Sequence, residues 1–288
     1  SKIYQIFLDE NFCLKNCNLI FLNKQSVKRR RHSMILFGDY HTHTKYSRHG
    51  HGKGTVLENA SVALNKGLKQ IAITDHGFNH KYFGIRRRDI PFVKEDILNA
   101  KEVTGVDILL GVESNLISSN GEIDIEEQDF EFLDLLLMGH HVMVKMTSLQ
   151  DAQKLTWANF FGSPYAPSEE RLNRNTTAFL KALDKYPIDI ITHLNYGFPT
   201  DTLAVAKMAK EKGTMIELNN KHINFTDQEL EIMASEGVKF IINSDAHSPD
   251  RVGECNNAMN TVFRLDLPLN QIVNIDKLPK FSTKRGIN

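Results

Sequence analysis

Seven short apolar segments alternate with amphipathic ones along most of the chain, and this alternation constrains the fold more than any other feature. The apolar segments have the length of strands and lie at residues 35–40, 70–74, 107–111, 134–138, 188–192, 214–218 and 239–243. Helical patterns separate them at residues 55–66, 91–103, 168–185, 201–212 and 226–236. Strands that alternate with helices form parallel βα units. The sequence therefore predicts an α/β fold, either a doubly wound sheet or a barrel.

The ends of the predicted helices carry the expected local signals. Ser168 and Thr226 stand where N-caps belong, and Gly105, Gly213 and Gly237 follow helical segments as stops. No Gly-x-Gly-x-x-Gly or Walker-type loop follows any predicted strand. This absence disfavours a fold that binds a nucleotide cofactor.

Residues 1–33 differ from the rest of the chain. They contain only short apolar runs without sustained periodicity, followed by a basic run at residues 27–32. A basic run of this kind is more often a solvated tail than a nucleic-acid site. Because Met34 opens the first good strand, we expect it to be the natural start. We therefore divide the chain into an N-terminal extension at 1–33, non-native or disordered, and a single domain at 34–288 that includes the C-terminal tail.

Charge and cysteine content exclude several classes of protein. Lys plus Arg equals Asp plus Glu at 35 each, so no overall field attracts nucleic acid or an anionic membrane. No apolar run reaches the ~18–20 residues of a membrane span. The three cysteines, Cys13, Cys17 and Cys255, form no disulfide framework, which is typical of a reducing compartment. We expect a cytoplasmic protein without a membrane partner, of unknown oligomeric state.

Side chains that bind metals recur directly after the predicted strands. In chain order they are His41 and His43, Asp75 and His76, Glu113, His140 and His141, His193, Glu217 and Asn219, and Asp245 and His247. The carboxyl ends of parallel strands meet at one edge of the fold, so these side chains should converge there. Imidazoles with a few carboxylates suit zinc, manganese or iron better than magnesium or calcium.

The number of ligands predicts more than one ion. About four ligands saturate one zinc, so eight or nine imply two or three metals, with a carboxylate such as Glu113 as a bridge. Metals ~3.5–4 Å apart share a hydroxide and clamp a phosphate between them. Such a site is suited to phosphoester hydrolysis.

Several motifs together resemble those of the polymerase and histidinol phosphatase (PHP) superfamily. They are DYHTHT at 39–44, TDHG at 74–77, GVE at 111–113, GHH at 139–141 and SDAH at 244–247. The resemblance extends from about residue 34 to about 267. It is greatest to the stand-alone bacterial phosphatases of this family, because GVESNL at 111–116 is followed by GEID at 121–124.

The resemblance implies a distorted (βα)7, TIM-like barrel with a trinuclear site at the C-terminal ends of its strands. The metals would be zinc foremost, with manganese or iron(II) as alternatives. On the family pattern their ligands are His41, His43, His49, His76, Glu113, His141, His193, Asp245 and His247.

Three of these assignments involve a choice or a departure from the family. His49 competes with His51 in the same loop, and the resemblance favours His49, which leaves His51 facing solvent. His140 and His141 point to opposite faces of an extended strand, and the alignment selects His141. Leu194 follows His193 where the family usually has proline, which loosens the turn without removing a ligand.

Substrate binding is expected from cations outside the metal ligands. The run at 86–88 consists of three arginines, and a guanidinium matches phosphate oxygens. The family pattern points mainly to Arg88, with Arg86 second, and Asn219 should support the metal ligands or the substrate. The carboxylates Glu113 and Asp245 are the expected catalytic residues.

The sequence thus predicts a metal-dependent phosphoric ester hydrolase, a phosphomonoesterase acting on a small phosphorylated metabolite. A hydroxide that bridges two metals would attack phosphorus in line with the leaving alkoxide, while the metals and Arg88 neutralise charge. The alternatives are a histidinol-phosphate phosphatase, a phosphodiesterase or exonuclease on short nucleic acids, and a non-catalytic metal- or partner-binding module.

Overall fold

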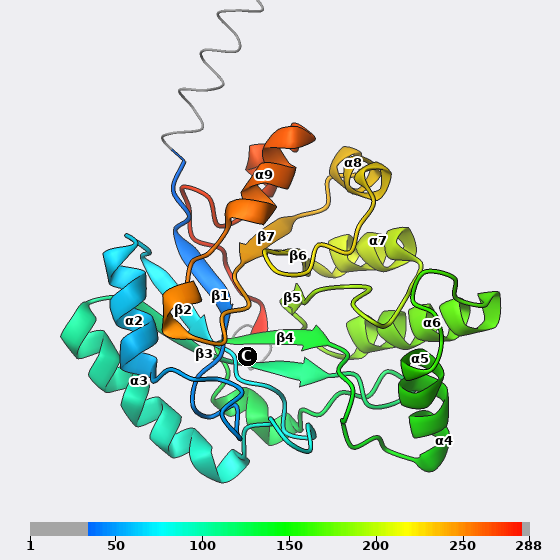
Figure 1. The fold of residues 1–288 in the computed structure, drawn as a ribbon, viewed down its shortest axis with the longest axis horizontal. Coiled ribbons are helices and arrows are strands. Elements are labelled where there is room, and N and C mark those ends of the chain that lie inside the picture. The colour runs from blue at the N-terminus through cyan, green and yellow to red at the C-terminus, as the bar shows by residue number, and fades with distance from the viewer. Residues whose placement is uncertain (1–33, 284–288) are drawn as a thin grey trace, which may run out of the picture. The chain divides into compact units, whose positions relative to one another are not determined.

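A computed structural model describes residues 34–283, and its centre is a sheet of seven parallel strands. The strands are paired in sequence order, β1 to β7. Their bounds are β1 Gly38–Thr42, β2 Gln70–Ile73, β3 Asp107–Asn115, β4 Leu135–Gly139, β5 Ile190–Ile191, β6 Met215–Asn219 and β7 Phe240–Asn243. Figure 1 shows these strands with the helices outside them.

The sheet almost closes on itself, because β1 and β7 are joined by a bridge and by side chains. Thr42 and Ala246 form an isolated parallel bridge. The backbone N–H of Tyr40 donates to Asn243 Oδ1 at 2.9 Å, and the Asp39 carboxylate accepts from the N–H of Ser244 at 3.1 Å. The (βα)7 barrel implied by the family resemblance is therefore confirmed. Its distortion lies at this seam, where side chains replace a continuous backbone ladder.

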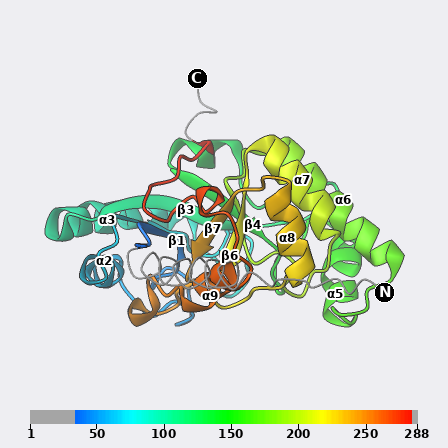
Figure 2. The ribbon, with the colours of Figure 1, turned by 90° about the horizontal axis from the view of Figure 1, so that it is seen from above.

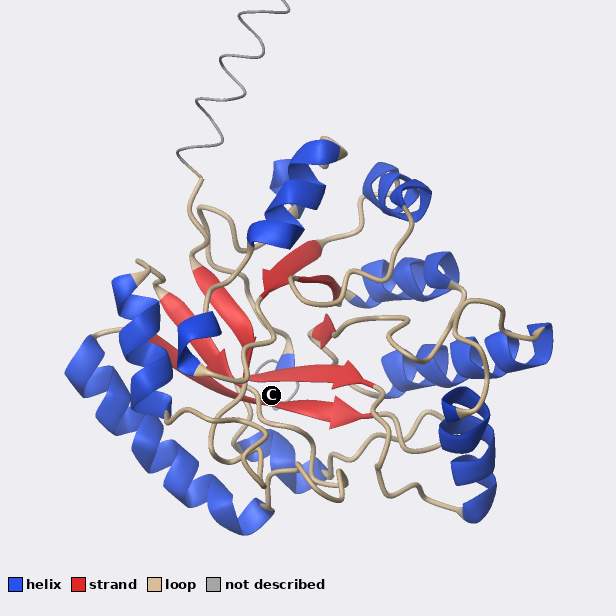
Figure 3. Ribbon diagram, in the orientation of Figure 1, coloured by secondary structure: helices blue, strands red, loops and turns tan. Residues whose placement is uncertain are grey.

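Helices cover the outside of the strands (Figure 3). Figure 2 shows α2 and α3 on one side of the sheet and α6, α7 and α8 on the other. The bounds are α2 Val56–Asn65, α3 Ile90–Thr104, α4 Leu149–Asp151, α5 Ala158–Phe160, α6 Glu169–Lys185, α7 Thr202–Lys212, α8 Asp227–Ser235 and α9 Asn256–Arg264. The predicted caps are confirmed, since Ser168 accepts from the N–H of Arg171 and Thr226 forms a capping box with Glu229.

Two strands differ from the prediction by more than one residue in length. β3 continues to Asn115, four residues past the predicted end at Gly111. Gly111 is not a turn: a Cβ there would lie 2.7 Å from Leu135 Cδ2, so the glycine allows close packing against β4. β5 is reduced to Ile190–Ile191, since only these two residues pair with both neighbouring strands.

The sequence reading missed the helices α4, α5 and α9. α9 begins at Asn256 without a side-chain cap, so its start carries no local signal. α4 and α5 are separated by a π-helical turn, Ala152–Trp157, which disturbs the 3.6-residue periodicity. No helix in the described part of the chain is long and apolar enough to cross a membrane.

A cluster of buried apolar side chains joins the strands. It comprises Tyr40, Ala72, Leu135, Leu137, Ile190, Met215 and Ile241, with Leu109 of β3 packed against it. Of the described residues, those from Leu36 to Thr283 belong to one compact unit. The predicted N-terminal extension, its basic run, Cys13 and Cys17 lie outside the described residues.

Candidate metal centre

Side chains from the ends of six strands converge on one buried place. Four overlapping groups each bring three ligand atoms within 4.8 Å of one another. The groups are His41–Glu113–His193, His41–His43–Asp245, His76–Glu113–His141 and His43–His76–His247. They share His41, His43, His76 and Glu113, so they form one continuous cluster rather than separate sites.

Glu113 lies at the middle of this cluster and has no solvent exposure. Its Oε1 lies 2.8 Å from His193 Nε2 and 3.2 Å from His41 Nε2, and its Oε2 lies 2.8 Å from His76 Nδ1. Although burial raises the pKa of Glu113, His141, His41 and His76 hold it well below the usual range. A charged carboxylate with both oxygens facing imidazoles is placed to bridge two cations.

The carboxylate of Asp245, just after β7, lies beside two further imidazoles of the cluster. Its Oδ1 lies 3.5 Å from His43 Nε2 and 3.3 Å from His247 Nδ1. Burial raises the pKa of Asp245, but His41 and His43 hold it well below its usual range. The Asp245 backbone has φ 54°, in the left-handed region that non-glycine residues seldom adopt. Strain of this kind is typical of functional sites.

A second layer of side chains orients the imidazoles. His41 Nδ1 lies 2.8 Å from Glu217 Oε1, and His141 Nδ1 lies 2.8 Å from Asn115 Oδ1. A ring that donates from Nδ1 leaves its Nε2 lone pair free to bind a metal. Both partners therefore turn Nε2 toward the centre of the cluster.

The buried atoms of the cluster fit a metal because protein groups do not satisfy them. Within residues 34–283, His41 Nε2, His43 Nε2, both nitrogens of His76 and Glu113 Oε2 are buried without a hydrogen bond, although His76 Nδ1 and Glu113 Oε2 lie only 2.8 Å apart. Burial lowers the pKa of His76 to about 3 and lowers that of His43 well below its usual range. Both rings are neutral at pH 7 and keep lone pairs for a cation. Buried polar atoms without partners are costly, and divalent ions would satisfy these.

The structure places His51, and not the expected His49, beside the cluster. His49 is exposed and lines a separate surface pocket with Lys45 and Arg86. His51 instead stacks on Phe83, with ring centroids 3.9 Å apart, and its Nε2 lies 3.0 Å from His247 Nε2.

Hydrogen bonds that anchor the loop explain why His51, and not His49, lies over the cluster. Arg48 donates to the carbonyls of Gly84 and Lys81, and the Asp75 carboxylate accepts from Thr44 and Ser47. His49 and Gly50 then turn outward with φ of 58° and 71°. This turn brings His51 back over the cluster.

Among the described residues, the arginine run predicted to bind phosphate is not part of the lining of the cavity beside the cluster. Arg87 makes a bidentate pair with Asp129 at 2.9 and 2.7 Å in the 3-10 turn Arg87–Asp89. Arg86 and Arg88 are exposed, and within the described chain neither lines the cavity at the cluster. The run leads directly into α3, so its side chains lie on the outer layer of the barrel.

The cavity beside the cluster has a volume of ≈ 1080 Å³. Its lining includes His141, His193, His247 and the cationic side chain of Lys221. Lys221 Nζ lies 3.8 Å from Asp245 Oδ2. A cation in this position can bind an anion that approaches the cluster. Lys221 was not among the site residues predicted from the sequence.

Asn219 supports the cluster rather than the cavity. It is fully buried, and its Nδ2 donates to Glu217 Oε2 at 2.9 Å and to Asp245 Oδ2 at 3.4 Å. Glu217, which orients His41, was noted at a strand end in the sequence but no role was predicted for it. Its position two residues before Asn219 on the same strand was the available signal, because such residues share a face.

Replacing Glu217 with glutamine should weaken metal binding by roughly 10–100-fold, the usual cost of losing a partner behind a ligand. The carboxylate accepts from His41, the His193 N–H, Asn219 and Asn243, so an amide places a donor against a donor. Zinc affinity measured by competition with a chelator, with circular dichroism to establish folding, checks this. Wild-type affinity in folded protein would contradict it.

Comparison with known proteins gives concordant matches. A family model described as "PHP domain" matches residues 39–244. A "probable phosphatase" of Caldanaerobacter subterraneus is 32% identical over 267 residues, covering 87% of this chain and 92% of the relative. One of Aliivibrio fischeri is 29% identical over 265 residues, covering 87% and 91%.

A solved structure shares the fold at low sequence identity. It is the histidinol phosphate phosphatase of Lactococcus lactis in complex with zinc, L-histidinol and phosphate. The TM-score is 0.58 at 14% identity, and the match covers 86% of this chain and 98% of the other.

Proposed function

The chain belongs to the PHP domain family, and we propose that it is a metal-dependent phosphatase that hydrolyses small phosphate monoesters. The observation that carries this proposal is the set of four overlapping ligand groups around Glu113. Relatives named as phosphatases support the reaction class. The description of the Lactococcus enzyme with L-histidinol and phosphate supports a small phosphorylated substrate.

We assign the metal ligands as a set of nine, with one change from the expectation. His51 takes the place of His49, and the others are His41, His43, His76, Glu113, His141, His193, Asp245 and His247. This set suits two or three divalent ions, zinc foremost and manganese or iron(II) as alternatives. When bound, such ions supply positive charge that acidifies water and polarises a phosphoryl group.

The protein's own residues bind and orient the reactants. Lys221 attracts the phosphate to the mouth of the cluster and neutralises part of its charge. Glu113 and Asp245 would hold the cations, and Glu217 and Asn115 orient His41 and His141 toward the cluster. The imidazoles that line the cavity, among them His80 and His222, are placed to exchange protons with the leaving group.

The proposal is tested by assaying the purified full chain with zinc, manganese and iron(II). We expect hydrolysis of p-nitrophenyl phosphate well above that of bis-p-nitrophenyl phosphate, and two or three metal ions per chain by elemental analysis. Predominant turnover of the diester would contradict the monoesterase assignment. Metal binding without turnover of either substrate would favour a non-catalytic module.

Replacing Lys221 with alanine should raise KM for p-nitrophenyl phosphate roughly tenfold, as expected for one charge-assisted hydrogen bond. Metal content should stay unchanged, because the ammonium is not a ligand. Lys207→Ala, which removes an exposed lysine from α7, is the matched control. Steady-state kinetics of both variants check this, and equal KM values would exclude Lys221 as the phosphate cation.

A further inference from the structure

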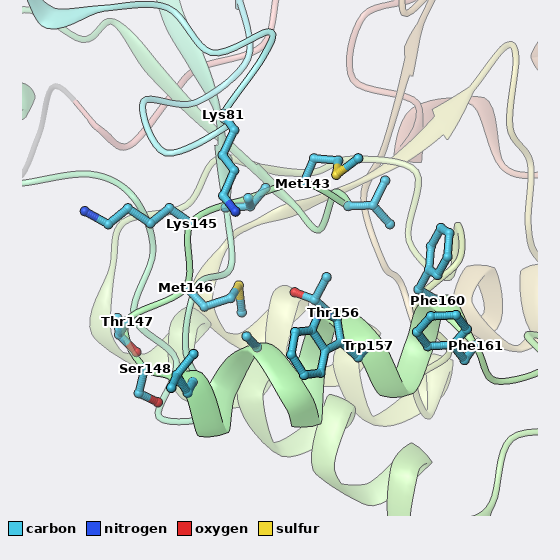
Figure 4. A pocket seen from close by; sticks show the side chains of 14 residues that line it. Lys81, Met143, Lys145, Met146, Thr147, Ser148, Thr156, Trp157, Phe160 and Phe161 are labelled. Atoms are coloured by element: carbon cyan, nitrogen blue, oxygen red, sulfur yellow. The ribbon is translucent and has the colours of Figure 1, made fainter.

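A second cavity lies beside the metal centre and differs from it in chemistry. Its volume is ≈ 820 Å³, and it lies between the loop after β4 and the helical segment of α4 and α5 (Figure 4). Its lining is largely apolar and includes Met143, Met146, Trp157, Phe160 and Phe161. A cavity of this size with an aromatic lining is typical of a site for a small apolar ligand.

The apolar side chains of this second cavity are unusually exposed. Trp157 is 50% exposed, Phe160 64% and Phe161 81%. Phe160 and Phe161 pack edge to face with ring centroids 5.1 Å apart, so they form one wall rather than isolated surface residues. Clustered apolar exposure of this kind marks a binding surface.

The second cavity adjoins the metal cavity, because Val142, next to the proposed ligand His141, lines both. On the facing side, Phe160 and Phe161 line the second cavity, while Asn159 and Tyr165 line the metal cavity. A molecule with its phosphate at the cluster can therefore extend over Val142 into the apolar space.

The backbone between the two cavities is held in place and strained. The N–H of Lys81 donates to Met143 O at 3.0 Å, and His80 and Val144 form an antiparallel bridge. Met143 has φ 67°, in the left-handed region. Met143 and the π-helical turn Ala152–Trp157 both lie in the walls of this cavity. Left-handed backbone and π-helical turns both recur at functional sites.

We propose that this cavity binds the hydrocarbon or aromatic group of the substrate, which makes the enzyme selective for amphiphilic phosphate monoesters. The inference rests on the proposed phosphatase activity at the adjacent cluster. The phosphate lies at the cluster beside Lys221, the ester oxygen passes Val142, and the apolar group packs against Met143, Trp157 and Phe161.

The test compares n-butyl phosphate with n-decyl phosphate, used below its aggregation concentration. Both release a primary alkoxide, so a difference in kcat/KM reports binding of the extra six methylenes. We expect the decyl ester to be preferred at least about tenfold. The double variant Phe160→Ala, Phe161→Ala should reduce this preference to about threefold or less, with kcat/KM for the butyl ester unchanged. Phe92→Ala, on α3 and 59% exposed, is the matched control.

A second measurement does not depend on turnover. Trp157 is the single tryptophan of the chain, so its fluorescence reports on this cavity alone. Decylphosphonate, which has no hydrolysable ester bond, should shift the emission saturably in the purified full chain. The shift should be weaker in the double variant, and butylphosphonate at the same concentration should give none.

Equal kcat/KM values for the two esters would overturn the proposal, and so would an unchanged Trp157 emission on addition of decylphosphonate. A third contradicting outcome is a double variant that keeps the preference for the decyl ester but changes its oligomeric state in light scattering. That outcome would identify the aromatic patch as an interface between copies of the chain. If neither ester is hydrolysed with any metal, the proposed function fails instead, and the emission shift alone decides whether the cavity binds the apolar group.

Discussion

Glu113→Gln is expected to abolish phosphatase activity, with kcat/KM at least roughly 10³-fold lower, and to reduce the metal content per chain. The carboxylate touches two of the four ligand groups, and its oxygens face His41, His193 and His76 within 3.2 Å. An amide of the same shape removes the negative charge that two adjacent cations require, and turns an N–H₂ group toward them. Elemental analysis and steady-state kinetics with p-nitrophenyl phosphate measure both effects.

The effect on folding is measured separately. In metal-free protein the nearby imidazoles hold the pKa of Glu113 below its usual range, so its charge stabilises the fold and the substitution should lower the free energy of unfolding. Chemical denaturation of both metal-free proteins measures this. Glu102→Gln on α3, an exposed glutamate, is the matched control and should leave metal content and rate unchanged. Wild-type metal content and rate in Glu113→Gln would rule out the proposed centre.

His51→Ala and His49→Ala form the second decisive comparison, because the two residues lie in one loop. His51→Ala should lower metal affinity roughly 10–100-fold and reduce the rate in proportion. Burial lowers the pKa of His51 to about 4, so its ring is neutral at pH 7, and its Nε2 lies 3.0 Å from that of His247. His49→Ala should change neither quantity more than about twofold, since surface substitutions have small effects.

Titration of zinc into each metal-free variant, followed by assay, separates the two residues. Each variant serves as the control for the other, because both remove an imidazole from the same anchored loop. A loss confined to His49→Ala would restore the family expectation and show that the loop rearranges when metal binds. Equal losses would indicate that the loop acts as a unit.

Patterning allowed the parallel α/β class and most of the cluster to be predicted for a simple reason, whereas the barrel followed from the family resemblance. Strand positions follow from local apolar patterning, and in a parallel fold every strand delivers its following residue to the same edge. His41, His76, Glu113, His193 and Asp245 come directly after or within strand ends, and all five belong to the overlapping ligand groups.

Residues in long loops could not be placed in the same way. Arg88 follows a ligand loop in sequence, but the turn at Arg87–Asp89 starts α3 and directs it outward. Lys221 has no sequence motif, and it lies at the cavity because Asn219 Oδ1 accepts the N–H groups of Lys221 and His222 at 2.9 Å each. The aromatic wall of the second cavity comes from a helix that the sequence pattern did not reveal.

By itself the sequence determined the fold class, the edge at which the site forms and the kinds of ligand gathered there. These depend on short-range periodicity and on a topological rule. The tertiary structure alone placed His51 rather than His49 beside the cluster, put Glu217 behind His41, placed Lys221 rather than Arg88 at the cavity and placed an apolar cavity next to the cluster. Each of these depends on contacts between residues distant in the chain, such as Arg48 on the carbonyl of Gly84, which no local pattern encodes.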